Sequence, residues 1–235
     1  MEGAVEIRFE LSRENNDSAE TRDLRFYLHD VELLTTDDQA RSMKLIANPW
    51  QSERVALIDL AGAVTADSNA TLKGYTGSKD SYAGLRFTLG VPFDLNHSNP
   101  LTAATPLNHP DLFWSWNSGY KFLRVDLADQ GHEWSFHLGS TGCSSASALR
   151  PPASPCAQPN LVRVELRGFD PTKQPVRVQL SELTSAMRAA NFAVCVGDYQ
   201  NNAACGAAYA KTGLDVATGA CSDAICKSQR LFGVE

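Results

Sequence analysis

Two tryptophans bracket one serine in the middle of the chain, at Trp114-Ser115-Trp116, and histidine-bearing segments lie on both sides of them. Asn96-His97 precedes the pair, and segment 136–143, which contains His137, follows it. Indole rings can be oxidised, imidazole binds copper, zinc and nickel, and thiols take part in redox chemistry. These residue types indicate redox or metal chemistry, although an aromatic pair can equally serve as core or as a platform on which a ligand stacks.

Any metal site in this chain must assemble from separate strands and loops, because no two histidines have the i, i+4 spacing of a helical site. Alternation in segment 27–33 places His29 on the same face as Tyr27, Val31 and Leu33. A histidine on such an apolar face is more often a hydrogen-bonded core residue than a ligand. Two or three imidazoles without a thiolate or a carboxylate pair would suit Cu(I) or Cu(II) better than a hard cation.

All six cysteines lie in the C-terminal part of the chain. They are Cys143, Cys156, Cys195, Cys205, Cys221 and Cys226. None forms the Cys-x-x-Cys spacing of a structural zinc or thioredoxin-like site, and turn residues surround them. We therefore expect disulfides that clamp loops, with Cys143 paired to Cys156 and two further bridges among the last four. Disulfides imply an oxidising compartment, either a periplasm or the extracellular space.

The bulk properties limit the partners of the protein. A chain of 235 residues with a net charge of -6 does not favour nucleic acid or an anionic membrane surface as partner. No apolar run approaches the length of a membrane span. No signal peptide is visible, and the opening Met1-Glu2-Gly3 is what an expression start placed on a mature, exported chain would give.

Alternating apolar and polar residues dominate the first three quarters of the chain and predict β-strands. The expected strands cover residues 5–11, 24–34, 55–60, 85–89, 122–127, 134–138, 161–166 and 176–180. Because turn-rich stretches and not helices separate these segments, we expect an all-β fold, mainly an antiparallel β-sandwich, with long loops and disulfides. One short C-terminal helix is expected over 182–190, with Ser181 as its cap.

Two long segments, 92–117 and 139–160, show no clear regular structure. The first contains Leu95, Leu101, Leu107 and Leu112, so we expect it to pack against the body of the protein. No linker or repeat divides the chain, which predicts a single β domain over 1–235 with a Cys-rich C-terminal tail at about 190–235. Neither a nucleophile elbow nor a phosphate-binding loop is present in the sequence, and we do not expect an enzyme.

Seven segments, taken in order, resemble those of a known family. They are 25–31, 82–92, Asn96-His97, Pro106-Leu107, Trp114-Ser115-Trp116, 119–124 and 136–143. The family is MbnP, a group of periplasmic copper-binding proteins also called metallo-mystery pair four-Cys-motif proteins, and the resemblance runs from about residue 5 to the C-terminus.

The resemblance implies a secreted, mostly β protein that binds copper and is the substrate of a dihaem partner enzyme. That partner, MbnH, is of the MauG and cytochrome c peroxidase type, and it oxidises a tryptophan of the family member to kynurenine. The more distantly similar copper proteins MopE and CorA bind Cu(I) through two histidines and a kynurenine. Copper, as Cu(I), is therefore the expected metal, and the periplasm is the expected location.

Carried over by matching segments, the resemblance implies His29 and His97 as copper ligands, with His137 as a third choice. The natural candidates for oxidation are Trp116 and Trp114, followed by Trp134, which lies in the same expected strand, 134–138, as His137. The alternative function is a metal-free β-sandwich module that stacks a sugar or a peptide on the Trp-Ser-Trp platform.

Overall fold

The computed structural model describes residues 3–12, 19–60, 68–129, 131–147, 149–189, 194–197, 199 and 202–234. Its strands are β1 (Ala4–Ser12), β2 (Glu20–Thr35), β3 (Ala40–Ser42), β4 (Lys44–Leu45), β5 (Ala56–Asp59), β6 (Thr71–Tyr75), β7 (Tyr82–Leu89), β8 (Phe113–Ser115), β9 (Gly119–Asp129), β10 (His132–Gly139), β11 (Val162–Arg167), β12 (Val176–Gln179), β13 (Val194–Val196) and β14 (Phe232–Gly233). Its helices are α1 (Phe93–Asn96), the 3₁₀ turn η1 (Pro110–Leu112), α2 (Ser181–Ala189), α3 (Ala203–Ala210) and α4 (Asp223–Cys226). No described helix has both the length and the apolar character needed to span a membrane.

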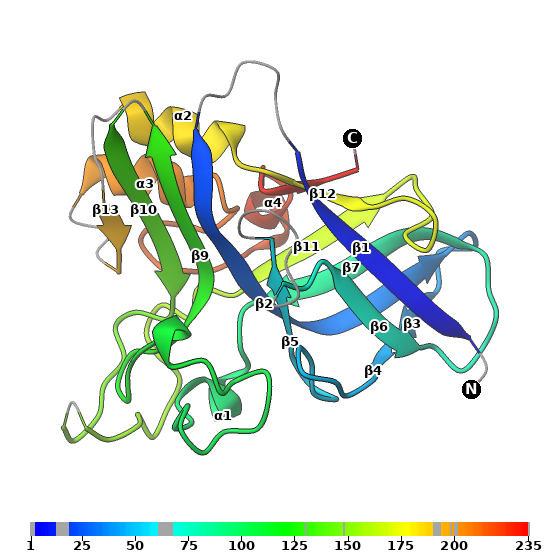
Figure 1. The fold of residues 1–235 in the computed structure, drawn as a ribbon, viewed down its shortest axis with the longest axis horizontal. Helices are drawn as coiled ribbons and strands as arrows, with labels where there is room; N and C mark the ends of the chain where they lie inside the picture. The colour runs from blue at the N-terminus through cyan, green and yellow to red at the C-terminus, as the bar shows by residue number, and fades with distance from the viewer. Residues whose placement is uncertain are drawn as a thin grey trace.

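Two sheets form the body of the protein (Figure 1). The smaller has the order β14-β12-β1-β6-β4, and the larger contains the path β11-β7-β2-β9-β10-β13 with β3, β5 and β8 attached at its sides. Most pairs are antiparallel, as predicted, but β1 pairs with β12 and β10 with β13 in parallel. The expected all-β fold is confirmed, although the sequence pattern missed the strands β3, β4, β6, β8, β13 and β14 and the helices α1, α3 and α4.

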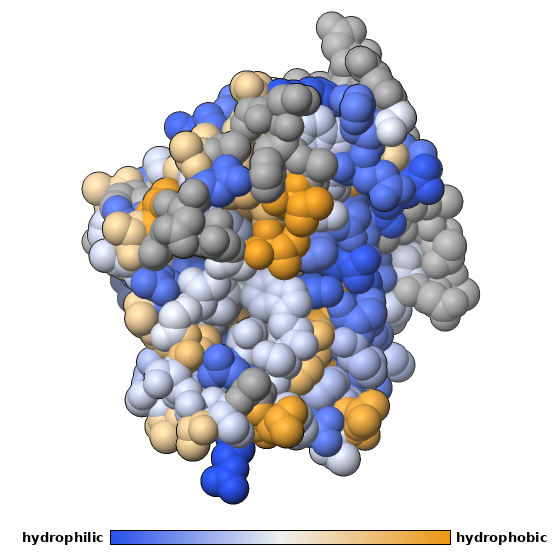
Figure 2. Space-filling view, turned by 90° about the vertical axis from the view of Figure 1, so that its left-hand side faces the viewer, coloured by the Kyte–Doolittle hydropathy of each residue, from blue (hydrophilic) through white to orange (hydrophobic). Residues whose placement is uncertain are grey.

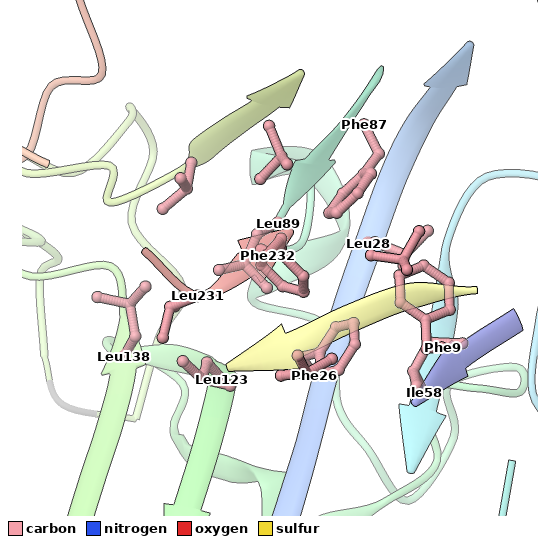
Figure 3. Close-up of a cluster of buried hydrophobic side chains, with 14 of the residues drawn as sticks. Phe9, Phe26, Leu28, Ile58, Phe87, Leu89, Leu123, Leu138, Leu231 and Phe232 are labelled. Carbon is pink, nitrogen blue, oxygen red and sulfur yellow. The ribbon is translucent and has the colours of Figure 1, made fainter. Parts of the chain in front are cut away.

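A cluster of four phenylalanines joins the two sheets. Phe9 and Phe232 come from β1 and β14 of the small sheet, while Phe26 and Phe87 come from β2 and β7 of the large one. Their ring centroids lie 5.1 to 6.0 Å apart in edge-to-face geometry, an arrangement that aromatic rings favour. Figure 3 shows these rings meeting at the centre of the core, with residues of both sheets around them.

The C-terminal segment contributes to the same core. Tyr199, Tyr209 and Leu214 are almost fully buried in it, alongside Leu183 and Met187 from one face of α2. The helix α2 matches the expected one, but its predicted cap is wrong by one residue. Because Leu180 O accepts the backbone hydrogen bond from Thr184, the chain is already helical at Ser181. Ala190, the expected helix end, lies outside the described residues.

Three disulfides form, as the cysteine pattern predicted. They are Cys143–Cys156, Cys195–Cys205 and Cys221–Cys226. The first closes the long loop after β10, the second ties β13 to α3, and the third lies at α4. Each bridge therefore closes a short local loop, which restricts the unfolded chain there.

A β-bulge in β2 sets the direction of His29. The register against β7 slips between His29 and Glu32, and Asp30 has a positive φ of 50°. The extra residue turns the strand over, so Val31 and Leu33 point into the main core while Tyr27 belongs to a second cluster on the opposite face. The expectation that His29 shares a face with Val31 and Leu33 is therefore wrong, because simple alternation assumes an unbulged strand.

The first long loop packs on that opposite face of the large sheet. Leu107 and Leu112 are buried there with Tyr27, Tyr120 and Phe122. The prediction that this loop packs down is confirmed for most of its apolar residues; Leu101 is the exception, being 80% exposed. Both long loops lie together beyond the ends of β9 and β10 (Figure 1). On the face that includes them, hydrophobic residues form separate patches among polar ones (Figure 2).

Phe232 gives a test of the sheet-to-sheet core. Replacing Phe232 by Ala should lower the free energy of unfolding by about 3–5 kcal/mol, because it removes a buried ring and leaves a cavity between the sheets. Leu101→Ala, at the exposed tip of the loop, should change it by less than about 0.5 kcal/mol. Chemical denaturation followed by circular dichroism measures both, and equal effects would show that the C-terminal strand does not contribute to the core.

Candidate metal centre

Asn96 fixes the loop that carries His97. Its side chain is buried, its Oδ1 accepts a hydrogen bond from Tyr120 N at 2.9 Å, and its Nδ2 donates to Ser140 Oγ at 3.3 Å. Gly119 allows this close approach, since it has a φ of 77° and a Cβ there would lie 2.5 Å from Asn96 O. The end of α1, the start of β9 and the end of β10 are thus held together by one amide.

His97 directly follows Asn96 and is only 7% exposed. Its Nδ1 lies 3.0 Å from Trp116 O. A carbonyl oxygen can only accept, so Nδ1 carries the proton and Nε2 carries the lone pair. Burial lowers the pKa of His97 below its ordinary value, although the Trp116 carbonyl opposes this, and the ring is neutral at pH 7. A neutral imidazole with one nitrogen held by a carbonyl has the form of a metal ligand.

The two tryptophans of the Trp-Ser-Trp segment lie beside this histidine. Trp116 supplies the carbonyl that holds His97, and its ring meets Phe113 edge-on at 6.1 Å. Trp114 packs its ring on Gly139, where a Cβ would lie 2.5 Å from the indole carbon Cζ3. Both indoles are half-buried. Asn117 continues the contact by donating to Cys143 O at 3.3 Å, so the segment lies against the disulfide loop.

His29 is a buried polar residue whose ring is poorly satisfied. It is 5% exposed, and neither ring nitrogen has a hydrogen-bond partner of good geometry, although Asp30 Oδ2 lies 3.0 Å from Nδ1. Burial lowers the pKa of His29, and the Asp30 carboxylate only partly opposes this. The ring is therefore neutral and its Nε2 is unsatisfied, which is costly for a buried polar atom unless something binds it.

His29 and His97 face the same side of the large sheet. The charge of Asp94, on α1 three residues before His97, acts on the His29 ring. A cleft of about 500 Å³ is lined by Asp30, the next residue in the chain, and by Thr88, the register partner of His29, although His29 itself does not line it.

His137 is committed to an ion-pair network. Its Nε2 lies 2.8 Å from Asp126 Oδ1, and Arg124 binds the same carboxylate at 2.7 Å. Arg124 also pairs with Asp23, which continues the network along the large sheet. His137 therefore already has a strong partner, and a metal at Nε2 would have to displace it.

Trp134 lies on the other face of β10 from His137. It packs against the main core and lines a small cavity with Leu127 and Met187. Its indole Nε1 is buried without a hydrogen-bond partner. Trp134 therefore belongs to the α2 side of the protein, away from the loops that hold His97 and Trp116.

The described contacts bring His97 and Trp116 together, with Trp114 nearby, and place His29 on the same face. Within the described part of the chain, His97, Cys143 and Cys156 are the one set of three potential ligand groups whose atoms lie within 4.8 Å. His29 and His97 fit copper, because each is a buried neutral imidazole: His29 Nε2 has no hydrogen-bond partner, and His97 Nε2 has a long contact of 3.4 Å with Asn96 Nδ2. The sequence analysis did not predict that Asn96 positions His97. The disulfide beside His97 could be anticipated, because Cys143 lies at the end of segment 136–143.

Comparisons with known proteins bear on the family and the fold of this chain. The model of the MbnP family matches residues 2–197. The structure is similar to that of MbnP from Methylosinus trichosporium, with a TM-score of 0.78 and 23% sequence identity over 97% of this chain and 93% of that one. At this identity the likeness concerns the fold. None of the curated proteins matches the chain significantly.

Asp126 gives a test of the network that holds His137. Burial would raise its pKa, but hydrogen bonds from His137, Ser135 and Arg124 hold it well below the ordinary value. This carboxylate therefore stabilises the fold above the unfolded pKa of about 3.9, and the stability is lost as pH falls through the lower folded pKa. Asp126→Asn should cost about 1–3 kcal/mol of unfolding free energy at pH 7.

The deficit of Asp126→Asn should shrink as the pH falls below about 4, because the wild type then loses the same contribution. Urea denaturation at neutral and acidic pH measures it. Glu133→Gln, at an exposed site on the same hairpin, is the matched control and should show little change at either pH. A deficit that does not depend on pH would contradict the electrostatic origin of the effect.

Proposed function

This chain belongs to the MbnP family, and from that premise we propose that it is a periplasmic copper-binding protein whose tryptophan is oxidised by a dihaem partner enzyme. His29 and His97 hold Cu(I), and Trp116 is the first candidate for conversion to kynurenine. The observation that carries the proposal is the 3.0 Å contact between His97 Nδ1 and Trp116 O, since it joins a ligand to an oxidisable residue.

The chemistry of the two imidazoles supports Cu(I). Cu(I) accepts a low coordination number and binds neutral imidazole well. The lone pair of His97 Nε2 is oriented by the contact at Nδ1, while His29 Nε2 has no hydrogen-bond partner and His29 Nδ1 lies beside Asp30. Bound copper would give these buried lone pairs a partner, and burial would limit its contact with oxygen and water.

The surroundings of Trp116 support oxidation from a distance. Its ring contacts Phe113, Phe113 contacts Tyr120 at 5.0 Å, and Tyr120 contacts Tyr27 at 5.7 Å. This series of rings leads from the half-buried indole towards the face of β2 that carries His29. A dihaem enzyme docked over the Trp-Ser-Trp segment could withdraw electrons without touching the indole directly.

The oxidation balances with a peroxide as oxidant. Two molecules of hydrogen peroxide each deliver one oxygen atom to the indole, one to C2 and one to C3, and the C2–C3 bond breaks. Each peroxide molecule is thereby converted to water. Hydrolysis then releases the C2 carbon as formate. The product, kynurenine, has gained one oxygen and lost one carbon relative to tryptophan. Its aniline nitrogen and ketone are donors that an indole lacks.

The metal-free platform is the weaker alternative. A stacking platform needs exposed ring faces, whereas Trp114 packs on Gly139 and Trp116 on Phe113. Both indoles are half-buried. Quenching of tryptophan fluorescence by a sugar, in protein purified without copper, would favour that alternative.

Removing either ligand should weaken copper binding. His29→Ala and His97→Ala should each lower the Cu(I) affinity by more than about tenfold, because a two-imidazole site cannot be kept with one imidazole. Competition with a chromophoric Cu(I) chelator under anaerobic conditions measures the affinity. His132→Ala removes an exposed histidine at the start of β10 and should have no effect. Unchanged affinity in both ligand variants would contradict the assignment.

Oxidation should be confined to the Trp-Ser-Trp segment. After incubation with its dihaem partner and hydrogen peroxide, peptide mass spectrometry should show the kynurenine mass change at Trp116. Trp116→Phe should abolish this change. Trp50→Phe should leave it intact, since Trp50 stacks on His109 and lies outside the Trp-Ser-Trp segment. A change at Trp50, or at no tryptophan, would overturn the proposal, and a change at Trp114 would move the site within the segment.

A further inference from the structure

One of the three disulfides lies against a histidine lone pair. His97 Nε2 is 3.9 Å from Cys156 Sγ, and the nitrogen and both sulfurs of Cys143–Cys156 lie within 4.8 Å of one another. Among the described residues, the other two bridges take part in no such cluster. The sulfurs of a disulfide are poor metal donors, but the two thiolates that it yields on reduction are strong ones.

The imidazole is already oriented towards these sulfurs. Trp116 O holds His97 Nδ1, so the proton sits on Nδ1 and the lone pair at Nε2. The other polar atom near Nε2 is Asn96 Nδ2, at a long 3.4 Å. His97 and Cys156 are each 7% exposed, while Cys143 is half-buried. The nitrogen donor and one sulfur are thus sheltered, and a reductant can approach from the side of Cys143.

The loop does not depend on the disulfide to stay closed. Thr141 and Gln158 exchange two backbone hydrogen bonds of 2.9 and 3.0 Å, and Ala157 N donates to Gly142 O at 3.1 Å. Below them, Asn160 Nδ2 donates to Gly139 O at 2.6 Å. These bonds join the residues next to both cysteines, so the two thiols would remain close together after the bridge is broken.

We propose that reduction of Cys143–Cys156 opens a second metal site, in which the two thiolates and His97 Nε2 bind one Cu(I) ion. A dithiol reductant supplies the two electrons and two protons: its own sulfurs become a disulfide, and Cys143 and Cys156 become thiols. Copper binding then releases both thiol protons. Two sulfurs and one nitrogen form a soft, three-donor set that suits Cu(I), whereas structural zinc demands a fourth ligand.

This inference extends the proposed function by adding a redox-gated state of the same histidine. It shares His97 with the proposed imidazole site but does not need His29. In the oxidised protein copper would be held by imidazole alone, and in the reduced protein the thiolates would hold it more tightly. Reducing conditions would therefore shift copper from His29 towards Cys143 and Cys156.

The test compares dithiol-treated and untreated protein after addition of Cu(I) without oxygen. The treated wild type should bind one Cu(I) ion per chain more tightly than the untreated protein does. It should also show a thiolate-to-copper charge-transfer absorption in the near ultraviolet, which the untreated protein lacks. Cys143→Ser/Cys156→Ser should lose this band after the same treatment. Cys221→Ser/Cys226→Ser, which removes the bridge at α4, is the matched control and should keep it.

Two further variants separate this site from the proposed function. His29→Ala should leave the charge-transfer band intact, and His97→Ala should lower the affinity of the treated protein by about tenfold or more. Circular dichroism of the reduced protein verifies that it stays folded. The inference is overturned if Cys143–Cys156 resists a dithiol in the folded protein, if the Cys143→Ser/Cys156→Ser variant keeps the band, or if His97→Ala binds as tightly as wild type. Failure of oxidised protein to bind copper would contradict only the proposed function.

Discussion

The buried amide of Asn96 is the constraint on which the candidate site depends. The Asn96 side chain accepts a hydrogen bond from the backbone N–H of Tyr120 and donates one to Ser140. It therefore joins the α1 loop to two strands of the large sheet. A buried amide that is satisfied in this way fixes its neighbours strongly, because breaking either contact leaves a polar group unpaired in the core. His97 is the next residue, and its direction follows from this tie. Gly119 is required by the same packing, since a side chain there would collide with Asn96.

The bulge at Asp30 has a comparable effect on the other side of the site. Side chains of β2 alternate between the main core and the opposite face on both sides of the bulge. The bulge shifts this alternation by one residue, so the strand contributes to both hydrophobic clusters. As a result His29 points away from the main core while its strand continues to pack on both sides. Bulges re-aim side chains in this manner at many functional sites. His29 Nε2 is left there without a hydrogen-bond partner, so its ring remains available to a ligand.

Much of the fold was predictable from sequence, because long strands with regular alternation, such as β2, β7 and β9, carry their own signal. The Cys143–Cys156 bridge was also predictable, since its cysteines are neighbours in a turn-rich loop. The two-residue strand β14 was not, because two residues show no periodicity and pair only after the sheets meet. Helix α3 was missed because its Ala-rich sequence resembled a small-residue tail. The bulge at Asp30 has no pattern of its own, and so the face of His29 was wrongly assigned.

Copper coordination by His29 and His97 is the central proposal for this protein. X-ray absorption at the copper edge of the oxidised, Cu(I)-loaded protein tests it most directly, because imidazole rings and sulfur scatter differently. We expect imidazole nitrogen neighbours without sulfur, and a reduced imidazole contribution in His97→Ala. A sulfur shell in the oxidised protein, or a spectrum unchanged by His97→Ala, would contradict it.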